Sequence, residues 1–298
     1  MQVIEEEDEW RTTRDFTQES TQLSAQPVWS SASGRARNIR KPTGVHPFGT
    51  ENCCVFLADG TYLEPLAVGN EQAAVKAIAG GNVFVTRDRL YRETLGNDGF
   101  SAVVLGTANA DADHARFVDA GLSAGDELSF SRVFTDTSGK SETASFKLAF
   151  AAGSKATDAF LFACERINAP KIDRTALQAH ANGVTGIVEI VAVSEAPSQQ
   201  RRLISIAAGT EAGSDTVFEL SNATLTVVEP ADFATRFGIS AGAPSELRFA
   251  AIVYSVRNVG VVAKLLAAGA IAHDIRGNQI VVPPAPGQGA VFVFREIK

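Results

Sequence analysis

The sequence predicts an α+β fold of tandem βαβββ modules, and two observations support this prediction. First, an apolar strand that closes on a glutamate recurs at Tyr62-Leu63-Glu64, Phe162-Ala163-Cys164-Glu165, Val227-Val228-Glu229 and Phe294-Arg295-Glu296. Second, beyond residue 100 the order of a strand, a glycine-ended helix and further strands returns three times. The chain therefore resembles one supersecondary unit used four times. The first copy is either incomplete or built from weak strand and helix formers.

Composition and charge exclude several classes of protein. The chain has 298 residues, 45% of them hydrophobic and 20% charged, as in globular proteins. Its formal net charge is −7 and no Lys/Arg-rich block occurs, which argues against a nucleic-acid partner. The N-terminus is acidic and no apolar run reaches the roughly 18 residues of a membrane helix. The sequence therefore predicts a cytoplasmic protein with no membrane partner.

The composition divides the chain into three parts. Residues 1–41 form an atypical N-terminal arm without a sustained period of 2 or 3.6, which is either disordered or a degenerate first strand and helix. Residues 42–175 and residues 176–298 are each predicted to form a pair of modules. The sequence leaves open whether modules pair within one chain or between the chains of a homodimer.

The first predicted elements are a hairpin and a helix. Strands are expected over residues 50–58 and 61–68, joined by the Asp59-Gly60 turn. A helix over residues 71–79 is ended by Gly80-Gly81.

The remaining modules follow the same order. In the second module we expect a strand over residues 100–106, a helix over 110–120 with Phe117 and Val118 on its inner side, and strands over 127–135, 144–151 and 159–167. The third module has a strand at 186–193, a helix at 198–208 and strands at 217–220 and 223–228. In the fourth, a strand at 247–256 and a helix at 259–268 precede strands at 273–275, 279–282 and 290–294.

Four short stretches resemble the motifs of a known family. They are His46-Pro47-Phe48-Gly49-Thr50-Glu51-Asn52, Asp59-Gly60-Thr61-Tyr62-Leu63-Glu64, Phe162-Ala163-Cys164-Glu165 and His180-Ala181-Asn182-Gly183-Val184. These are similar to the HPxGTxN, DGxYLE, FxCE and HxNG motifs of glyoxalase-like domain proteins. That family belongs to the vicinal oxygen chelate superfamily of glyoxalases, bleomycin-resistance proteins and extradiol dioxygenases. The resemblance implies curved mixed sheets that enclose a cavity.

The resemblance also implies a divalent metal, which could be Mn, Fe, Ni, Zn or Mg. In the superfamily, residues of the first and last strands hold the metal, and it stabilises an enediolate or similar anion. Last-strand carboxylates are present, so Glu64 and Glu165 are the expected ligands. The usual first-strand histidine positions hold Val188, Ala251 and Ala102, which bind no metal. Glu189 lies one residue after the expected ligand position at Val188, so we expect its side chain on the opposite face of the strand.

These features define an expected site and three functional hypotheses. Glu64, His46 and Glu165 are the candidate catalytic residues, because two converging carboxylates raise the pKa of one and make a general acid or base. Asn52, Tyr62, His180 and Asn182 are expected to line the substrate pocket.

The leading hypothesis is a protein that binds a small oxygenated organic molecule in a cavity between modules. The alternatives are a metal-dependent lyase, isomerase or dioxygenase, with His46 or His180 as base, and a sequestering, resistance-type binding protein.

Structural roles compete with several of these assignments. Glu229 and Glu296 are expected to be solvated or salt-bridged residues at strand ends. His180 can equally be a turn residue before Asn182-Gly183. The sequence alone does not decide whether the protein is an enzyme.

Overall fold

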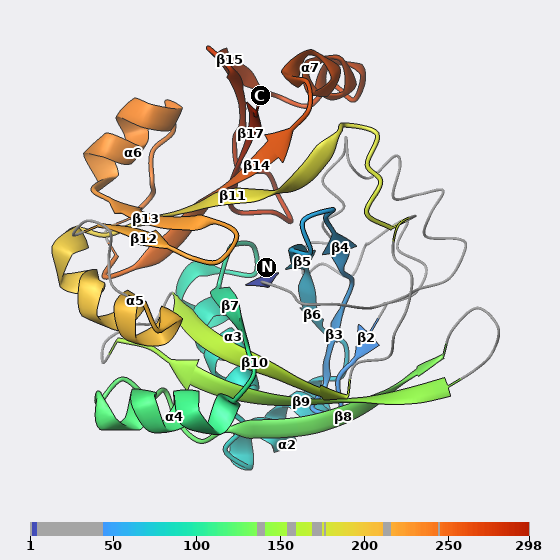
Figure 1. The fold of residues 1–298 in the computed structure, drawn as a ribbon, viewed down its shortest axis with the longest axis vertical. Coiled ribbons are helices and arrows are strands. Elements are labelled where there is room, and N and C mark those ends of the chain that lie inside the picture. The colour runs from blue at the N-terminus through green and yellow to red at the C-terminus, as the bar shows by residue number, and fades with distance from the viewer. Residues whose placement is uncertain are drawn as a thin grey trace.

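The protein contains two large β-sheets with helices packed on both faces (Figure 1). A computed structural model describes residues 2–4, 44–135, 141–153, 159–168, 175, 177–210, 216–243 and 245–297. Each large sheet has seven strands, and a third, smaller sheet has three. The α+β class and the repeated modules predicted from the sequence are confirmed.

Sheet 1 contains the strands from the first half of the chain. Across the sheet the order is β4 (Val55–Phe56), β5 (Tyr62–Glu64), β1 (Gln2–Ile4), β7 (Ala102–Thr107), β10 (Phe160–Asn168), β9 (Ser141–Ala151) and β8 (Leu128–Thr135). β7 is parallel to β10, and β10, β9 and β8 are antiparallel neighbours. This arrangement is the predicted second module.

Sheet 2 contains the strands from the second half. Its order is β12 (Val217–Glu219), β13 (Thr224–Val228), β11 (Val184–Val193), β14 (Arg248–Val256), β17 (Val291–Glu296), β16 (Gln279–Val282) and β15 (Asp274–Arg276). β11 is parallel to β13 and β14 is parallel to β17, while β11 and β14 pair antiparallel. The two modules of this half are therefore joined through their first strands.

The predicted hairpin over residues 50–68 is divided between two sheets. Its outer parts, β3 (Thr50–Asn52) and β6 (Leu66–Val68), join β2 (Gly44–Val45) in the small sheet, and its inner parts are β4 and β5 of sheet 1. Pro65 separates β5 from β6, and its carbonyl accepts the N–H of Cys53 at 3.2 Å. Because proline has no N–H to donate, it interrupts a strand ladder at this point.

β1 lies between β5 and β7, running antiparallel to β5 and parallel to β7. β11, the first strand of the third module, is instead parallel to β13, the last strand of that module, and antiparallel to β14. β1 is thus reversed relative to a regular first strand. The rest of the predicted N-terminal arm lies outside the described residues, and the domain boundaries at residues 41 and 175 stay predictions.

The helices are α2 (Glu71–Ala79), α3 (Val83–Leu95), α4 (Ala110–Asp119), α5 (Arg201–Ala208), α6 (Pro230–Phe237) and α7 (Val259–Ala268), with a 3₁₀ turn at Pro197–Gln200 before α5. α2, α4, α5 and α7 confirm the predicted helices, whereas α3 and α6 were not expected. Val118 of α4 is 52% exposed, so only Phe117 of the expected inner pair is buried. No helix among the described residues is long and apolar enough to cross a membrane.

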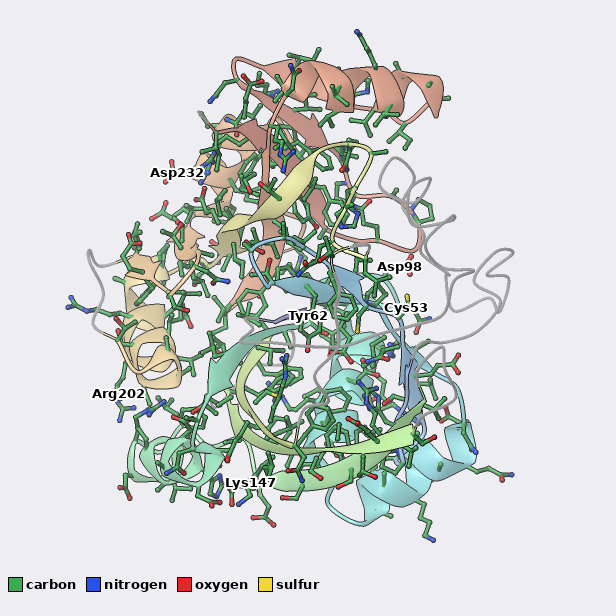
Figure 2. All side chains as sticks on the ribbon, turned by 45° about the vertical axis from the view of Figure 1, so that its right-hand side comes forward. Cys53, Tyr62, Asp98, Lys147, Arg202 and Asp232 are labelled. Carbon is green, nitrogen blue, oxygen red and sulfur yellow. The ribbon has the colours of Figure 1, made fainter. Side chains whose placement is uncertain are left out.

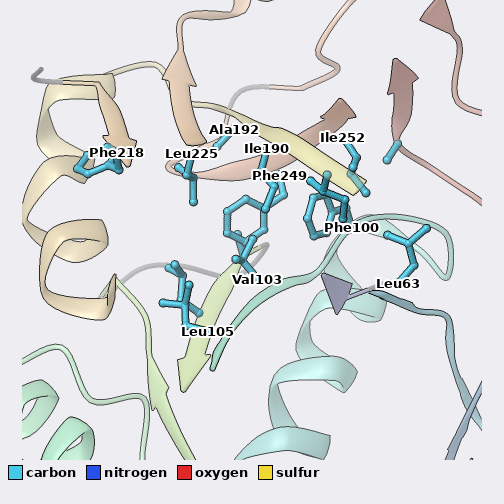
Figure 3. Close-up of a cluster of buried hydrophobic side chains, with 14 of the residues drawn as sticks. Leu63, Phe100, Val103, Leu105, Ile190, Ala192, Phe218, Leu225, Phe249 and Ile252 are labelled. Atoms are coloured by element: carbon cyan, nitrogen blue, oxygen red, sulfur yellow. The ribbon is translucent and has the colours of Figure 1, made fainter. Parts of the chain in front are cut away.

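The two large sheets share one hydrophobic core. Leu63 and Val103 of sheet 1 belong to the same buried cluster as Ile190 and Phe249 of sheet 2 (Figure 3). Helices α4, α5 and α7 add side chains to this cluster. We call the side of each sheet that points into this core its shared face, and the opposite side its far face. Side chains from α2 and α3 pack on the far face of sheet 1, and those of α6 on the far face of sheet 2.

The shared core predicts a large effect for Phe249→Ala. The Phe249 ring is 1% exposed and its centroid lies 5.0 Å from that of Phe100. We expect this substitution to lower the free energy of unfolding by about 3–5 kcal/mol, as for other buried aromatic residues. Urea denaturation followed by circular dichroism measures the change. The control Val118→Ala should change it by less than about 0.5 kcal/mol, and equal losses in both variants would contradict the shared core.

Candidate functional site

A cluster of buried and half-buried polar side chains lies on the far face of sheet 1. We call it the Glu64 cluster; its members are His46, Asn52, Tyr62, Glu64, Arg132 and Arg166. Neighbouring side chains of a strand point to opposite faces. Leu63 points into the shared core, so Tyr62 and Glu64 point to the far face. Figure 2 shows Tyr62 near the middle of the molecule.

The turn between β2 and β3 holds His46 in place. The His46 N–H donates to the Thr50 carbonyl at 2.8 Å, and the imidazole Nδ1 lies 2.9 Å from Thr50 Oγ1. Gly49 has φ of +92°, and a Cβ there would lie 2.5 Å from the Asn70 carbonyl oxygen. Glycine is therefore required at this position. The HPxGT motif thus fixes the imidazole, which stacks on the Phe48 ring with centroids 5.0 Å apart.

His46 and Glu64 lie side by side but do not form an ion pair. His46 Nε2 is 3.9 Å from Glu64 Oε1. Burial, with help from the nearby charge of Arg132, lowers the pKa of His46 from 6.5 to about 3. The imidazole is therefore neutral at physiological pH, with Nε2 directed toward the carboxyl group.

The surroundings of Glu64 shift its carboxyl group toward the neutral form. Its side chain is buried, and burial raises its pKa against the opposing effects of Asn52, Arg132 and Arg166. The Asn52 amide Nδ2 donates a hydrogen bond to Glu64 Oε1. A raised pKa makes a carboxyl group a better proton donor and acceptor in general acid–base steps.

The other reactive groups near Glu64 are held neutral. Arg166 Nη2 donates to the Tyr62 hydroxyl at 3.1 Å, yet burial raises the pKa of Tyr62 well above its usual value. Burial also raises the pKa of Cys164 to about 11 and that of Cys53 to about 12. Since the thiolate is the nucleophilic form, neither cysteine is an activated nucleophile.

Aromatic side chains make the surroundings of the cluster apolar. Phe48, Phe84 and Phe130 contact the His46 ring, and Phe146 and Phe162 belong to the same buried cluster. A low local dielectric strengthens every polar interaction within it and makes an uncompensated charge costly.

Glu165 does not join Glu64, contrary to the sequence prediction. Leu161 and Ala163 of β10 point into the shared core, and Glu165 shares their face. Its Oε2 accepts the N–H of Ala110 at the start of α4, at 2.9 Å. The two glutamates therefore lie on opposite faces of sheet 1, and they do not form the expected metal site or acid–base pair.

The last-strand glutamates of the second and fourth modules share a structural role. Glu296 Oε2 accepts the N–H of Val259 at the start of α7, also at 2.9 Å, as Glu165 does for α4. Glu229 differs, because it is exposed and is the N-cap residue of α6 without a side-chain hydrogen bond.

His180 and Asn182 also make structural contacts instead of lining the cluster. His180 Nε2 donates to the Phe56 carbonyl at 2.7 Å, and Asn182 Oδ1 accepts the N–H of Val184 at 3.2 Å. Asp59 Oδ2 in the β4–β5 turn accepts the N–H of Ile187 at 3.0 Å. The HxNG motif therefore connects the end of β4 to the start of β11.

The residues present do not fit a superfamily-type metal centre. Within the described part of the chain, no group of three or more His, Cys, Asp or Glu side chains is arranged to hold an ion. His46 and Glu64 supply two candidate donors, whereas sites for zinc and similar metals use three or four protein ligands. The charge of Arg132 beside both residues also opposes a bound cation.

Glu189 is a buried charged residue, and the prediction that it lies on the face opposite Val188 is wrong. A register shift between Ile187 and Glu189 in the β11–β14 pairing moves Glu189 to the far face of sheet 2. Arg236 donates to both carboxylate oxygens, at 2.8 and 2.6 Å, and Arg295 donates at 2.9 Å. Burial alone would raise the pKa of Glu189, but the two guanidinium groups hold it below its usual value.

The comparisons with known proteins agree with this architecture. The sequence model of the glyoxalase-like domain family matches residues 32–206. The match covers more than half of the chain, and the protein belongs to the glyoxalase-like domain family. No match was found among curated proteins.

Two solved structures share the fold. A hypothetical protein from Staphylococcus aureus has a TM-score of 0.55 at 14% identity, over 85% of this chain and 87% of that one. A triple mutant of 4-hydroxymandelate synthase from Streptomyces coelicolor has a TM-score of 0.51 at 11% identity, over 99% and 90%. The vicinal oxygen chelate fold expected from the resemblance is thereby confirmed.

The glutamate contacts predict a stability loss without a site defect. We expect Glu165→Ala and Glu296→Ala each to lower the free energy of unfolding by about 0.5–2 kcal/mol, as for other lost helix caps. Urea denaturation measures the loss, with the exposed Glu229→Ala as the matched control. If Glu165→Ala destabilises no more than Glu229→Ala, Glu165 has no capping role.

The burial of His46 predicts a titration that starts only near pH 3. The folded pKa lies below the unfolded value of 6.5, so only the unfolded chain takes up a proton as pH falls from 6.5 toward about 3. In that window the free energy of unfolding falls by up to about 1.4 kcal/mol for each pH unit that the pH is lowered. NMR of the imidazole resonances, assigned with His46→Gln, should show His46 neutral at pH 5. A midpoint above pH 5.5 would contradict the buried geometry.

Proposed function

We propose that the protein binds a small oxygenated organic molecule on the far face of sheet 1, beside Glu64. The observation that supports this most strongly is the buried Glu64 carboxyl group with its raised pKa, held by Asn52 and facing a neutral imidazole. Perturbed acids in dry surroundings are typical of functional sites. Membership of the glyoxalase-like domain family is consistent with a small-molecule ligand.

The chemistry of the cluster favours a ligand rich in oxygen. Arg132 and Arg166 place two positive charges near Glu64, which favours carbonyl, enolate or carboxylate oxygens. The surrounding phenylalanine rings favour a ligand with a small apolar part and exclude water.

We further propose that Glu64 exchanges a proton with the bound molecule. In its neutral form the group can donate a proton to a ligand oxygen. In its ionised form it can take one from a carbon or hydroxyl group. His46, fixed by Thr50 and neutral, would orient the ligand through Nε2. Such general acid–base steps contribute about 10²–10⁴ in rate.

The sequence-based alternatives use the same site differently. Superfamily members often use divalent metals, but the donor set around Glu64 gives no specific support to Mn, Fe, Ni, Zn or Mg. A sequestering protein would bind the molecule without a proton step. A cytoplasmic location and a homodimer remain predictions from the sequence.

The proposal predicts that Glu64 variants lose function while Glu165 variants keep it. Small aldehydes, hydroxyketones and 2-oxo acids would be screened by thermal shift and then by calorimetry. A ligand at 100 times its Kd stabilises the folded state by about 2.7 kcal/mol. We expect Glu64→Ala to weaken binding at least tenfold and Glu64→Gln to lower turnover at least a hundredfold.

The controls separate the three hypotheses. Glu165→Gln, on the opposite face, should bind and turn over as the wild type does. If the Glu64 variants keep both activities, the proposed site is wrong. Binding without product formation would favour sequestration. Turnover that a chelator abolishes and an added divalent metal restores would favour the metal-dependent alternative.

A further inference from the structure

The far face of sheet 2 carries a second buried charge cluster, separate from Glu64. Glu189 of β11 is 9% exposed at its side chain and bonds Arg236 of α6 and Arg295 of β17. Arg236 binds both carboxylate oxygens, whereas Arg295 contributes only its Nη2. The two arginine side chains are 28% and 29% exposed. The carboxylate is thus enclosed while the guanidinium groups reach solvent.

The charges in this cluster do not balance. Two guanidinium groups face one carboxylate, which leaves one positive charge in excess. On α6, Asp232 is exposed and forms no ion pair with Arg236; it is labelled in Figure 2. On β17, Glu296 points to the shared face, where it contacts α7. The surroundings therefore favour a bound anion.

Gln279 supplies an unsatisfied acceptor next to Arg295. Its Oε1 is buried and has no hydrogen-bond partner. Gln279 of β16 and Arg295 of β17 are directly paired across the two strands. Their side chains share one face, with Cβ atoms about 4.5–5.5 Å apart, as in other cross-strand pairs. A buried acceptor of this kind requires a donor from water or from a ligand.

We infer that this face of sheet 2 binds a small 2-hydroxy carboxylate. The carboxylate would accept hydrogen bonds from the N–H groups of Arg295 that Glu189 does not use. The neighbouring hydroxyl would donate to Gln279 Oε1. Val253, Val281 and Val293 are buried in the apolar cluster beneath this face and hold β14, β16 and β17 in place.

The charge and the donor pattern select this class over other anions. A guanidinium group matches the two oxygens of a carboxylate. A phosphate dianion would meet one excess positive charge and the negative charge of Glu189. Acetate would satisfy Arg295 but leave Gln279 Oε1 without a donor. The hydroxyl group is therefore the feature that the site should recognise.

Calorimetry with glycolate, acetate and inorganic phosphate tests the inference. We expect the wild-type protein to bind glycolate about threefold to tenfold more tightly than acetate, the effect of one hydrogen bond. Gln279→Met should abolish this preference and leave the ion pairs intact. Arg295→Gln should weaken glycolate binding at least tenfold. Arg202→Gln, on α5 and outside the cluster, is the matched control.

Several outcomes would overturn the inference. These are equal affinity for glycolate and acetate in the wild type, stronger binding of phosphate, or unchanged glycolate binding in Arg295→Gln. If Arg295→Gln fails to fold, the preference lost in Gln279→Met decides the question. The preference for glycolate over acetate should depend on Gln279, which lies on sheet 2 and not beside Glu64, so failure of this site and failure of the Glu64 site are distinguishable.

Discussion

The alternation of side chains across the strands of sheet 1 determines what this protein can do. Leu63 and Leu161 must enter the core shared by the two sheets, since that core buries the shared face of each. Once Leu63 points inward, Glu64 has to point to the far face. By the same rule Glu165 follows Leu161 and points to the shared face. Two glutamates from similar motifs are thereby separated by the thickness of a sheet, and only one can take part in a site among the far-face aromatic residues.

The repeated glutamate has more than one physical meaning. In the second and fourth modules it accepts the first N–H of the module's helix, through Glu165 and Glu296. A carboxylate there satisfies an N–H that has no partner within the helix and interacts favourably with the helix dipole. In the first module, the described residues show Glu64 bonded instead to Asn52. The strongest repeat in the sequence thus marks a structural contact in two of its copies.

Local periodicity was sufficient to predict most of the fold but not its irregular points. The helices over residues 71–79 and 259–268 and the strand over 279–282 have the predicted bounds. α3 was missed because Val83, Phe84 and Val85 favour strands, and its helical state depends on packing against sheet 1. The register shift before Glu189 has no signal in a pattern of period two, so the sequence placed this residue on the wrong face.

Of the expected site, His46, Asn52, Tyr62 and Glu64 are brought together, because they belong to one continuous stretch. Glu165 is not, because its face depends on the pairing of β10 with distant strands. His180 and Asn182 are not, because they lie in the turn before β11 and bond backbone groups there.

The two far faces show how surroundings give one residue type two different chemistries. Glu64 has a neutral imidazole and an amide as its nearest polar partners, and burial dominates, so its pKa rises. Glu189 is bonded directly by two guanidinium groups, which outweigh burial, so its pKa falls. The raised pKa favours proton exchange by Glu64, whereas the lowered pKa of Glu189 favours a carboxylate that holds its partners in place. This contrast is the physical basis for proposing proton transfer on the far face of sheet 1 and recognition of charge on that of sheet 2, although both sheets are built from the same kind of module.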